Sequence, residues 1–392
     1  MTIIFSIYFI PLLYLASVLY WGLPFRFRKA FVLVSSSTVL CLIQPWFTLF
    51  LAALVLTVYW CAVAIEQKQK AALVPAIVAA LVTTLVVFRY LPEFFLLLHL
   101  NTTDLARAYL VPLGISYLVF KLIAFILDVY RGEIRRPSLT DLMVFVFFVP
   151  IFPAGPIQRF QEFVEQRMDS ISASDVVAGL ARMSVGYFKK IVLVGVVLQP
   201  VAYGSLLGDI ASGEGLSDIG TPVLLGFLIA ALVYAYLDLS AYADIAIGAS
   251  RLFGYRIMEN MNYPLFRPNL AEYWRCWHIS LSNWCRNNVY MPVLGRSRKP
   301  TLALYSSFAV MGMWHQISLT WLFWGMWHAS GIWLYTKWRR HRLSSWFQQN
   351  LPGHLAYVFG TLITVTWSAL GFSFIMFSDL KQSLRLLWQI LF

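Results

Sequence analysis

Three of the six histidines, His278, His315 and His328, stand close to tryptophans in the stretch 263–329 of a chain that is otherwise mostly apolar. An imidazole in such surroundings must form a hydrogen bond or face water. With a pKa near neutrality it can also accept a proton from a hydroxyl group, as the general base of acyl transfer does. A structural hydrogen bond explains any one of the three, whereas their grouping favours a reaction site that uses one of them.

Two aspartates, Asp238 and Asp244, lie inside the apolar run 222–249. Ionisable groups in such a run are costly and usually face a bundle interior or a watery cavity. Helical spacing places Asp238 on one face with Tyr234 and Tyr242, and Asp244 on another face with Arg251. Two interpretations follow: the carboxylates tie the helix to basic residues such as Arg251, or they take part in catalysis directly.

A single amphipathic helix is expected to begin after Asn269, which can cap it, with Glu272 as its third residue. Such a helix lies along the membrane interface or dips into it. One stripe of this helix carries apolar and aromatic side chains together with one histidine: Trp274, Trp277, His278, Leu281 and Trp284. Away from it point Glu272, Arg275, Ser282 and Arg286. An ordinary aromatic anchor is the alternative interpretation.

Several familiar catalytic signatures are absent from the sequence. It contains no GxSxG elbow, no P-loop, no HExxH and no GxGxxG after a strand. No third cysteine, histidine or carboxylate stands at ligand spacing from His278 and His315, so we expect no metal site. The four cysteines show no CxxC spacing and indicate neither a disulfide framework nor a zinc site.

The composition is that of an integral membrane protein. The 392 residues are 60% hydrophobic and 12% charged, whereas about a quarter of a soluble domain is charged. The net charge of +12 comes from short basic clusters between apolar runs, which is typical of loops kept on the cytoplasmic side of a membrane and not of a nucleic-acid surface.

Apolar runs of about 20 residues can each cross a bilayer as a helix. We expect about ten spans, roughly 3–23, 30–44, 46–65, 72–91, 109–130, 183–201, 222–249, 301–316, 317–336 and 354–377. Lysine and arginine counts place the N-terminus outside and the stretch 251–299 inside, with acidic outer loops at 93–104 and 202–221. The run 145–156 is broken by three prolines and is expected to be re-entrant. The run 317–336 forms a tight hairpin or a broken span with 301–316.

Six motifs resemble the bacterial branch of the membrane-bound O-acyltransferase family, which contains polysaccharide O-acetylases and proteins that D-alanylate teichoic acids. They are Pro112-Leu-Gly-Ile-Ser-Tyr117, Pro153-Ala-Gly-Pro-Ile157 with Arg159, Asp238-Leu-Ser-Ala-Tyr-Ala-Asp244-Ile-Ala-Ile-Gly248, Asn262-Tyr-Pro264, Tyr273-Trp-Arg-Cys-Trp-His-Ile-Ser-Leu281 and Gly312-Met-Trp-His315. These motifs run through most of the chain in the family's order.

The resemblance implies an all-α polytopic membrane protein, with tilted, re-entrant and interfacial helices around a central funnel or tunnel. His315 takes the position of the family's catalytic histidine and His278 that of its second histidine. Residues 1–392 would form one acyltransferase domain with its catalytic centre within 234–330. Further candidates for substrate binding or tunnel lining are Trp274, Arg275, Trp277, Arg286, Trp314, Trp321, Trp324, His328, Asp238 and Asp244.

The family resemblance also implies a cytoplasmic acyl thioester donor, acetyl-coenzyme A or an acylated phosphopantetheine carrier protein, and no permanently bound cofactor. The acceptor would be a hydroxyl group of an exported envelope polymer, reached directly or through a periplasmic or extracellular partner transferase. The location would be the bacterial cytoplasmic (inner) membrane.

The acyl group stays open between acetyl and D-alanyl. The acetylase motif usually reads WxRD, whereas this chain has Trp284-Cys-Arg286-Asn287-Asn288. A different class remains as an alternative: a transporter or flippase that uses the intramembrane histidines and aspartates.

Overall fold

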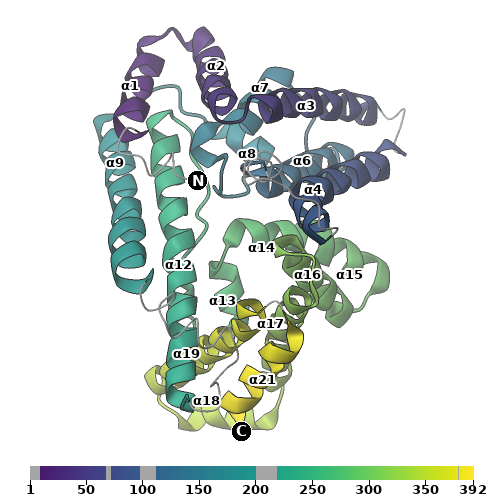
Figure 1. The fold of residues 1–392 in the computed structure, drawn as a ribbon, viewed down its shortest axis with the longest axis vertical. Coiled ribbons are helices and arrows are strands. Elements are labelled where there is room, and N and C mark those ends of the chain that lie inside the picture. Colours follow the sequence, from purple (N-terminus) through teal and green to yellow (C-terminus); the bar gives the residue numbers. More distant parts are fainter. Residues whose placement is uncertain (1–8, 68–71, 98–111, 200–218, 378) are drawn as a thin grey trace. The chain divides into compact units, whose positions relative to one another are not determined.

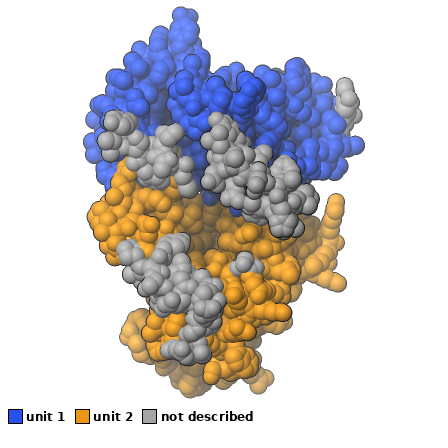
Figure 2. Space-filling view, viewed as in Figure 1, with its two compact units in different colours: residues 1–185, 243–258 blue, residues 186–242, 259–392 orange. Residues whose placement is uncertain are grey.

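The computed structural model describes residues 9–67, 72–97, 112–199, 219–377 and 379–392. Regular structure in these ranges is helical, apart from an isolated antiparallel bridge between Arg167 and Tyr255. The described residues fall into two compact units, residues 1–185 with 243–258, and residues 186–242 with 259–392 (Figure 2). The expected acidic loop 202–221 and the segment 98–104 lie almost wholly outside the described residues.

Among the described residues, four helices are long and apolar enough to cross a membrane, which agrees with the multi-pass membrane protein expected from the sequence. They are Pro45–Glu66, Leu73–Tyr90, Thr221–Leu252 and the helical stretch Gly353–Met376. A shorter apolar helix, α1, covers Phe9–Gly22. Each of these coincides with an apolar run expected from the sequence.

The first unit is built from helices of the N-terminal half (Figure 1). They are α1, α2 (Phe25–Ile43), α3 (Pro45–Glu66), α4 (Leu73–Leu97), α6 (Ile115–Tyr130), α7 (Leu139–Phe147), η1 (Val149–Ile151), α8 (Phe160–Glu165) and most of α9 (Ala173–Tyr187), with the end of α12 (Thr221–Leu252). Pro45 opens α3 at a position where its missing N–H costs nothing. The Ser138 side chain caps α7 by accepting a hydrogen bond from the Asp141 N–H.

The proline-rich segment after α7 is broken, as the sequence predicts. Helix α7 ends at Phe147, one short 3₁₀ turn follows at η1, and no helix resumes before Phe160. Gly114 fixes the position of this segment, because a Cβ atom there would lie 2.4 Å from the carbonyl oxygen of Phe152. Only glycine lets the start of α6 approach the broken backbone so closely.

Two glycines bring α9 and α12 together in the first unit. A Cβ at Gly248 would lie 2.5 Å from the backbone oxygen of Gly179, which is too close for any other residue. The expected span 183–201 is part of a longer element: α9 starts at Ala173 and continues as a π-helix, η2 (Phe188–Leu198). Amphipathic residues before 183 extend the helix beyond the apolar run that marks it in the sequence.

The second unit holds the stretch that is rich in histidine and tryptophan. Its elements are η2, most of α12, η4 (Pro264–Phe266), α13 (Leu270–Cys276), α14 (Ile279–Cys285), η5 (Arg286–Tyr290), α15 (Met291–Ser297), α16 (Pro300–His315), α17 (Leu319–Trp338), α18 (Arg342–Asn350), α19 (Gly353–Gly371), α20 (Ser373–Met376) and α21 (Leu380–Leu391). Of the two arrangements expected for these runs, helices α16 and α17 form the tight hairpin, and they pack side by side (Figure 1).

Candidate functional site

The expected helix after Asn269 begins as predicted but is not a single helix. The Asn269 side chain accepts a hydrogen bond from the Glu272 N–H at 2.9 Å and donates one to the Glu272 carboxylate at 2.7 Å. Helix α13 then ends at Cys276, and α14 starts at Ile279. Between them His278 adopts a left-handed backbone with φ of 43°, so the prediction of one continuous helix is wrong.

The loop that precedes α13 causes this break by taking over the backbone hydrogen bonds. The Ile279 N–H donates to the backbone oxygen of Asn260, and the Asn260 side-chain oxygen accepts from both the N–H and the hydroxyl of Ser280. The Asn262 N–H donates to the Cys276 carbonyl. These bonds replace the α-helical ladder, and His278 takes the strained turn that results.

The break leaves the expected pattern of burial intact. Trp274, Trp277, His278, Leu281 and Trp284 are all buried. Arg275 and Arg286 are exposed, as the amphipathic interpretation predicts. The indole of Trp277 stacks on Tyr273, with ring centroids 5.4 Å apart.

Two glycines position the histidine at the end of α16. A Cβ at Gly312 would lie 2.2 Å from the Trp321 carbonyl oxygen, and one at Gly325 would lie 2.3 Å from that of Phe308. The helices α16 and α17 therefore approach more closely than larger residues allow. The Ser318 side chain caps α17 by accepting from the Trp321 N–H, which fixes the turn between them.

This hairpin brings His315 into a cluster of aromatic rings, which we call the His–Trp cluster: His278, His315, His328, Trp274, Trp314, Trp321 and Trp324. The His315 ring stacks on Trp321 at 4.6 Å and meets Trp314 at 4.7 Å and Trp324 at 5.5 Å.

The other two histidines of the cluster join it through tryptophans. His278 contacts Trp314 with ring centroids 6.1 Å apart. His328 contacts Trp324 at 4.8 Å and Trp274 at 5.0 Å. Seven of the residues predicted for the site are thus brought together within one unit.

The three histidines differ in their access to solvent. His278 and His328 are each 2% exposed, whereas His315 is half-buried at the end of its helix. Burial lowers the pKa of His278 to about 4, so its imidazole is neutral at pH 7. His315 is therefore the histidine of the cluster that a solvent-borne acceptor reaches most easily.

The two aspartates of α12 lie in ion pairs. Asp238 pairs with Lys190 in the second unit, where Lys189 donates to the Ser240 hydroxyl at 2.7 Å. Asp244, which is buried in the first unit, pairs with Arg182 at 2.5 Å.

Arg251, which the sequence analysis names as a possible partner, pairs with neither Asp238 nor Asp244. It binds Asp175 at 2.9 Å, near the start of α9. The Ser172 hydroxyl and the Arg251 guanidinium lower the pKa of Asp175 to about 2, so this carboxylate stays ionised at neutral pH. The apolar run around them identifies the two carboxylates in the sequence. Their partners Lys190 and Arg182 come from segments 48 and 62 residues away and carry no sequence signal other than their charge.

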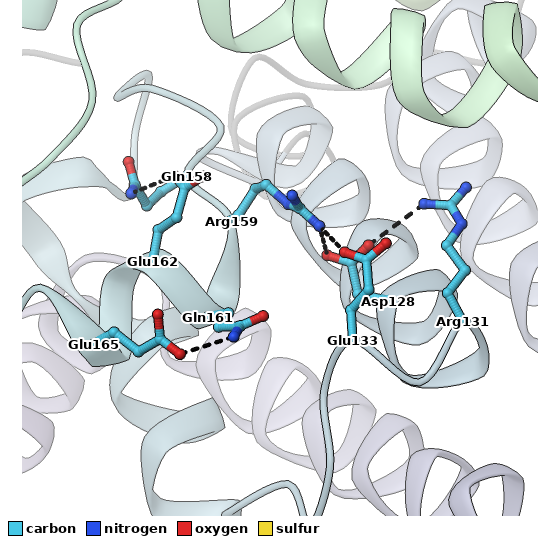
Figure 3. Close-up of polar contacts among 8 residues, drawn as sticks. All are labelled: Asp128, Arg131, Glu133, Gln158, Arg159, Gln161, Glu162 and Glu165. Atoms are coloured by element: carbon cyan, nitrogen blue, oxygen red, sulfur yellow. Dashed lines mark hydrogen bonds and ion pairs between the residues drawn. The ribbon is translucent and has the colours of Figure 1, made fainter.

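Arg159, which follows the broken segment, holds that segment to the end of α6 (Figure 3). Its guanidinium lies between Asp128, at 3.1 Å, and Glu133, while Arg131 contacts the other oxygen of Asp128 at 3.4 Å. The neighbouring Gln158 is buried, and its side-chain oxygen accepts from the Met258 N–H at 2.9 Å. This arrangement anchors a backbone that has no helix of its own.

No three histidine, cysteine, aspartate or glutamate side chains gather to hold a metal ion in the described ranges. The side chains of the His–Trp cluster offer proton transfer by imidazole and an apolar aromatic environment that limits access of water.

Comparison with known proteins places these features in a family. The model of the membrane-bound O-acyltransferase family (MBOAT) matches residues 31–378. A probable alginate O-acetylase, AlgI, of Pseudomonas fluorescens is 36% identical over 236 residues, which are 57% of this chain and 44% of the relative.

Two further relatives carry other names. A teichoic acid D-alanyltransferase of Streptococcus thermophilus is 29% identical over 59% of this chain and 58% of the relative. A peptidoglycan O-acetyltransferase of Helicobacter pylori is 27% identical over 74% of this chain and 58% of the relative. The matched regions thus span about half the length of these relatives.

Proposed function

The chain belongs to the membrane-bound O-acyltransferase family, and on this premise we propose that it transfers a short acyl group, acetyl or D-alanyl, from a cytoplasmic thioester to a hydroxyl group. The acceptor hydroxyl belongs to an exported cell-envelope polymer or to a relay towards one. The observation that carries the proposal is the half-buried His315, held at the end of α16 among Trp314, Trp321 and Trp324.

In the proposed reaction His315 acts as general base. Its imidazole takes the proton from the acceptor hydroxyl as the oxygen attacks the thioester carbonyl carbon. The tetrahedral intermediate then collapses, the carbon–sulfur bond breaks, and the thiolate leaves with the proton that His315 had accepted. The surrounding tryptophans keep water away from the thioester, so that transfer is favoured over hydrolysis.

His278 has a positioning role in this proposal. A neutral, buried imidazole beside Trp314 can orient a polar group of donor or acceptor without competing for the transferred proton. Arg275 and Arg286, both exposed, are suited to bind phosphates of a coenzyme A or phosphopantetheine donor. Asp238 and Asp244 contribute as helix ties through Lys190 and Arg182.

The finer architecture is part of the same proposal. About ten spans surround a funnel in the cytoplasmic membrane of a bacterium, so that a donor bound inside serves an acceptor bound outside. The partners are the acyl donor or its carrier protein, the envelope polymer, and a periplasmic or extracellular transferase.

Mass spectrometry of ester-linked acyl groups tests the proposal. Mild base releases these groups from the envelope polymers of cells that carry the wild-type chain, His315→Ala, His354→Ala or no copy. His354 is exposed and outside the cluster, so its variant controls for the loss of a histidine as such. We expect acetyl or alanyl esters with the wild type and His354→Ala only, and the mass of the ester identifies the acyl group.

Two results would contradict the proposal of acyl transfer by His315. Equal acylation by His315→Ala at equal expression would remove His315 as the base. No difference among all four strains, with equal polymer export, would favour the transport alternative over acyl transfer.

A further inference from the structure

The first unit contains a cavity of about 220 Å³ beside the start of α2. A water molecule takes about 30 Å³ of liquid volume, so the cavity has room for about seven waters or for a small polar group of a ligand. Its walls include Phe25, Phe163 and Tyr255, and the last two rings stack at 4.6 Å. The cavity has no part in the proposed transfer reaction.

Four charged side chains line this cavity, two of each sign. Lys29 and Asp141 form an ion pair at 2.5 Å and neutralise each other. Arg167 and Asp169 also line it, and in the described part of the chain neither forms an ion pair. Two opposite charges thus face one space without neutralising each other.

One N–H donor of Arg167 has no hydrogen-bond acceptor among the described residues. Its guanidinium stacks over the Phe25 ring at 4.3 Å, and its Nη1 atom is buried without a hydrogen-bond partner among the described residues. A buried guanidinium N–H without an acceptor destabilises the protein, and anionic oxygens are the strongest acceptors for it. The neighbouring backbone is fixed, since the Met168 N–H donates to the Gly254 carbonyl at 2.7 Å.

The backbone of Asp169 is held at the same rim. Arg28 donates to the Asp169 backbone oxygen at 2.8 Å and to the Leu23 carbonyl at 3.1 Å, which ties this residue to the turn between α1 and α2. Because Asp169 is exposed, its carboxylate is free to accept hydrogen bonds from a cationic group at the mouth of the cavity.

The surroundings indicate a lipid as the source of such a ligand. The cavity lies at the start of α2, where Arg26, Arg28 and Lys29 form a basic cluster. With the N-terminus outside, the first span places this cluster at the inner membrane surface. Along α1 and α2 aliphatic side chains are exposed, including Leu15, Leu19 and Val34. A lipid with its headgroup in the cavity would lay its acyl chains on this apolar surface.

We propose that this cavity binds the phosphoethanolamine headgroup of a phospholipid, with the phosphate on Arg167 and the ammonium group on Asp169. A zwitterion matches two unpaired charges of opposite sign, whereas a plain anion would meet the repulsion of Asp169. A choline headgroup carries no N–H to donate to that carboxylate and fits less well.

Native mass spectrometry of the purified chain in detergent tests this assignment without any need for catalytic activity. The protein is titrated with phosphatidylethanolamine, phosphatidylglycerol or phosphatidylcholine of the same acyl chains, and in a separate arm with inorganic phosphate alone. We expect one phosphatidylethanolamine to bind most tightly, and Arg167→Gln to weaken it about tenfold, which corresponds to about 1.4 kcal/mol.

Two more variants make the result specific. Asp169→Asn alters an exposed side chain, and we expect it to remove the preference for phosphatidylethanolamine over phosphatidylglycerol. Arg26→Gln removes an exposed positive charge from the same helix start and should leave binding unchanged, which controls for general attraction between the protein and lipid phosphates. A thermal unfolding curve for each variant confirms that it is folded.

Three outcomes would overturn the proposal. Arg167→Gln could bind phosphatidylethanolamine as the wild type does, in which case the headgroup is not in this cavity. Phosphatidylglycerol could bind more tightly in an Arg167-dependent manner, which would make the site a plain anion site. Inorganic phosphate could bind and displace the lipid with the same dependence on Arg167, which would identify a free anion as the ligand.

Discussion

The close contact between α16 and α17 predicts that Gly312→Ala damages both stability and acyl transfer. A Cβ atom at this position would lie 2.2 Å from the Trp321 carbonyl oxygen. Real Cβ contacts essentially never fall below 3.0 Å, so the Cβ atom and this carbonyl oxygen must separate by about 0.8 Å, the difference between these two distances, through a shift of the backbone of α16 or α17. The carbonyl that is pushed belongs to the tryptophan on which His315 stacks.

The expected magnitude combines two opposing effects. Alanine in place of glycine favours a helix interior by about 1 kcal/mol. Overpacking in a tight interface costs about 1–3 kcal/mol. A shift of about 1 Å in a catalytic group can lower the rate about 100-fold, so we expect activity to fall more clearly than stability.

Gly226→Ala is the matched control, because Gly226 lies in α12 and a Cβ there has no neighbour within 4 Å. Thermal unfolding in detergent, followed by tryptophan fluorescence, should show Gly226→Ala at or above the wild type and Gly312→Ala several degrees below the control. Ester-linked acyl groups in cells should be strongly reduced by Gly312→Ala alone. Equal melting temperatures and equal acylation for the two variants would refute the argument from close packing.

Three further predictions concern buried polar groups. Burial keeps the pKa of His278 near 4 in the folded protein, whereas a histidine in the unfolded chain has a pKa of about 6.5. Above pH 6.5 the titration of this histidine therefore costs no stability. As the pH falls from 6.5 towards 4, the unfolded chain takes up the proton first, and the free energy of unfolding falls by a total of about 3 kcal/mol. His278→Asn, which tolerates the left-handed backbone, should therefore flatten the decline of melting temperature over this range; an unchanged slope would rule out His278 as its source. Asn260→Ala removes the acceptor of two hydrogen bonds from Ser280 and should cost about 2 kcal/mol in unfolding free energy, with Asn260→Asp retaining the acceptor and most of the stability. Arg182→Ala should lower the yield of folded protein by removing the partner of Asp244, and Asp244→Asn in the same chain should restore it; failure of this rescue would show that the pair acts through contacts other than charge.

Local signals in the sequence were sufficient for several elements of the site. Asn269 caps α13 with Glu272 as predicted, and the prolines of 145–156 break the helix where expected. The hairpin that positions His315 follows from two adjacent apolar runs, and the resemblance to a family is confirmed by the family model. These features depend on residues close to one another in the chain, which is why spacing reveals them.

The break at His278 depends on a loop that sequence spacing does not connect to it. The spacing of the apolar side chains predicts one continuous helix. The broken form buries the same side chains, so spacing alone cannot distinguish the two. Asn260 decides the outcome because its oxygens accept hydrogen bonds from the N–H groups of Ile279 and Ser280, which lie 19 and 20 residues later in the chain. The ion pair of Asp244 escapes prediction for a similar reason, since its partner Arg182 lies 62 residues earlier in the chain.

The difference in burial among the histidines argues for a division of roles within the His–Trp cluster. A base with a pKa near 4 accepts a proton weakly at pH 7, because each unit below the working pH costs about 1.4 kcal/mol. His278 therefore suits a role in orienting a neutral group, and its left-handed backbone, fixed by the loop at Asn260, holds the ring in one place. His315 stands at a helix end where a polar acceptor can reach it, and the close packing of Gly312 against α17 sets its ring on Trp321. If this division is correct, His278→Asn lowers acyl transfer while leaving its pH dependence unchanged, whereas no substitution at His315 preserves transfer.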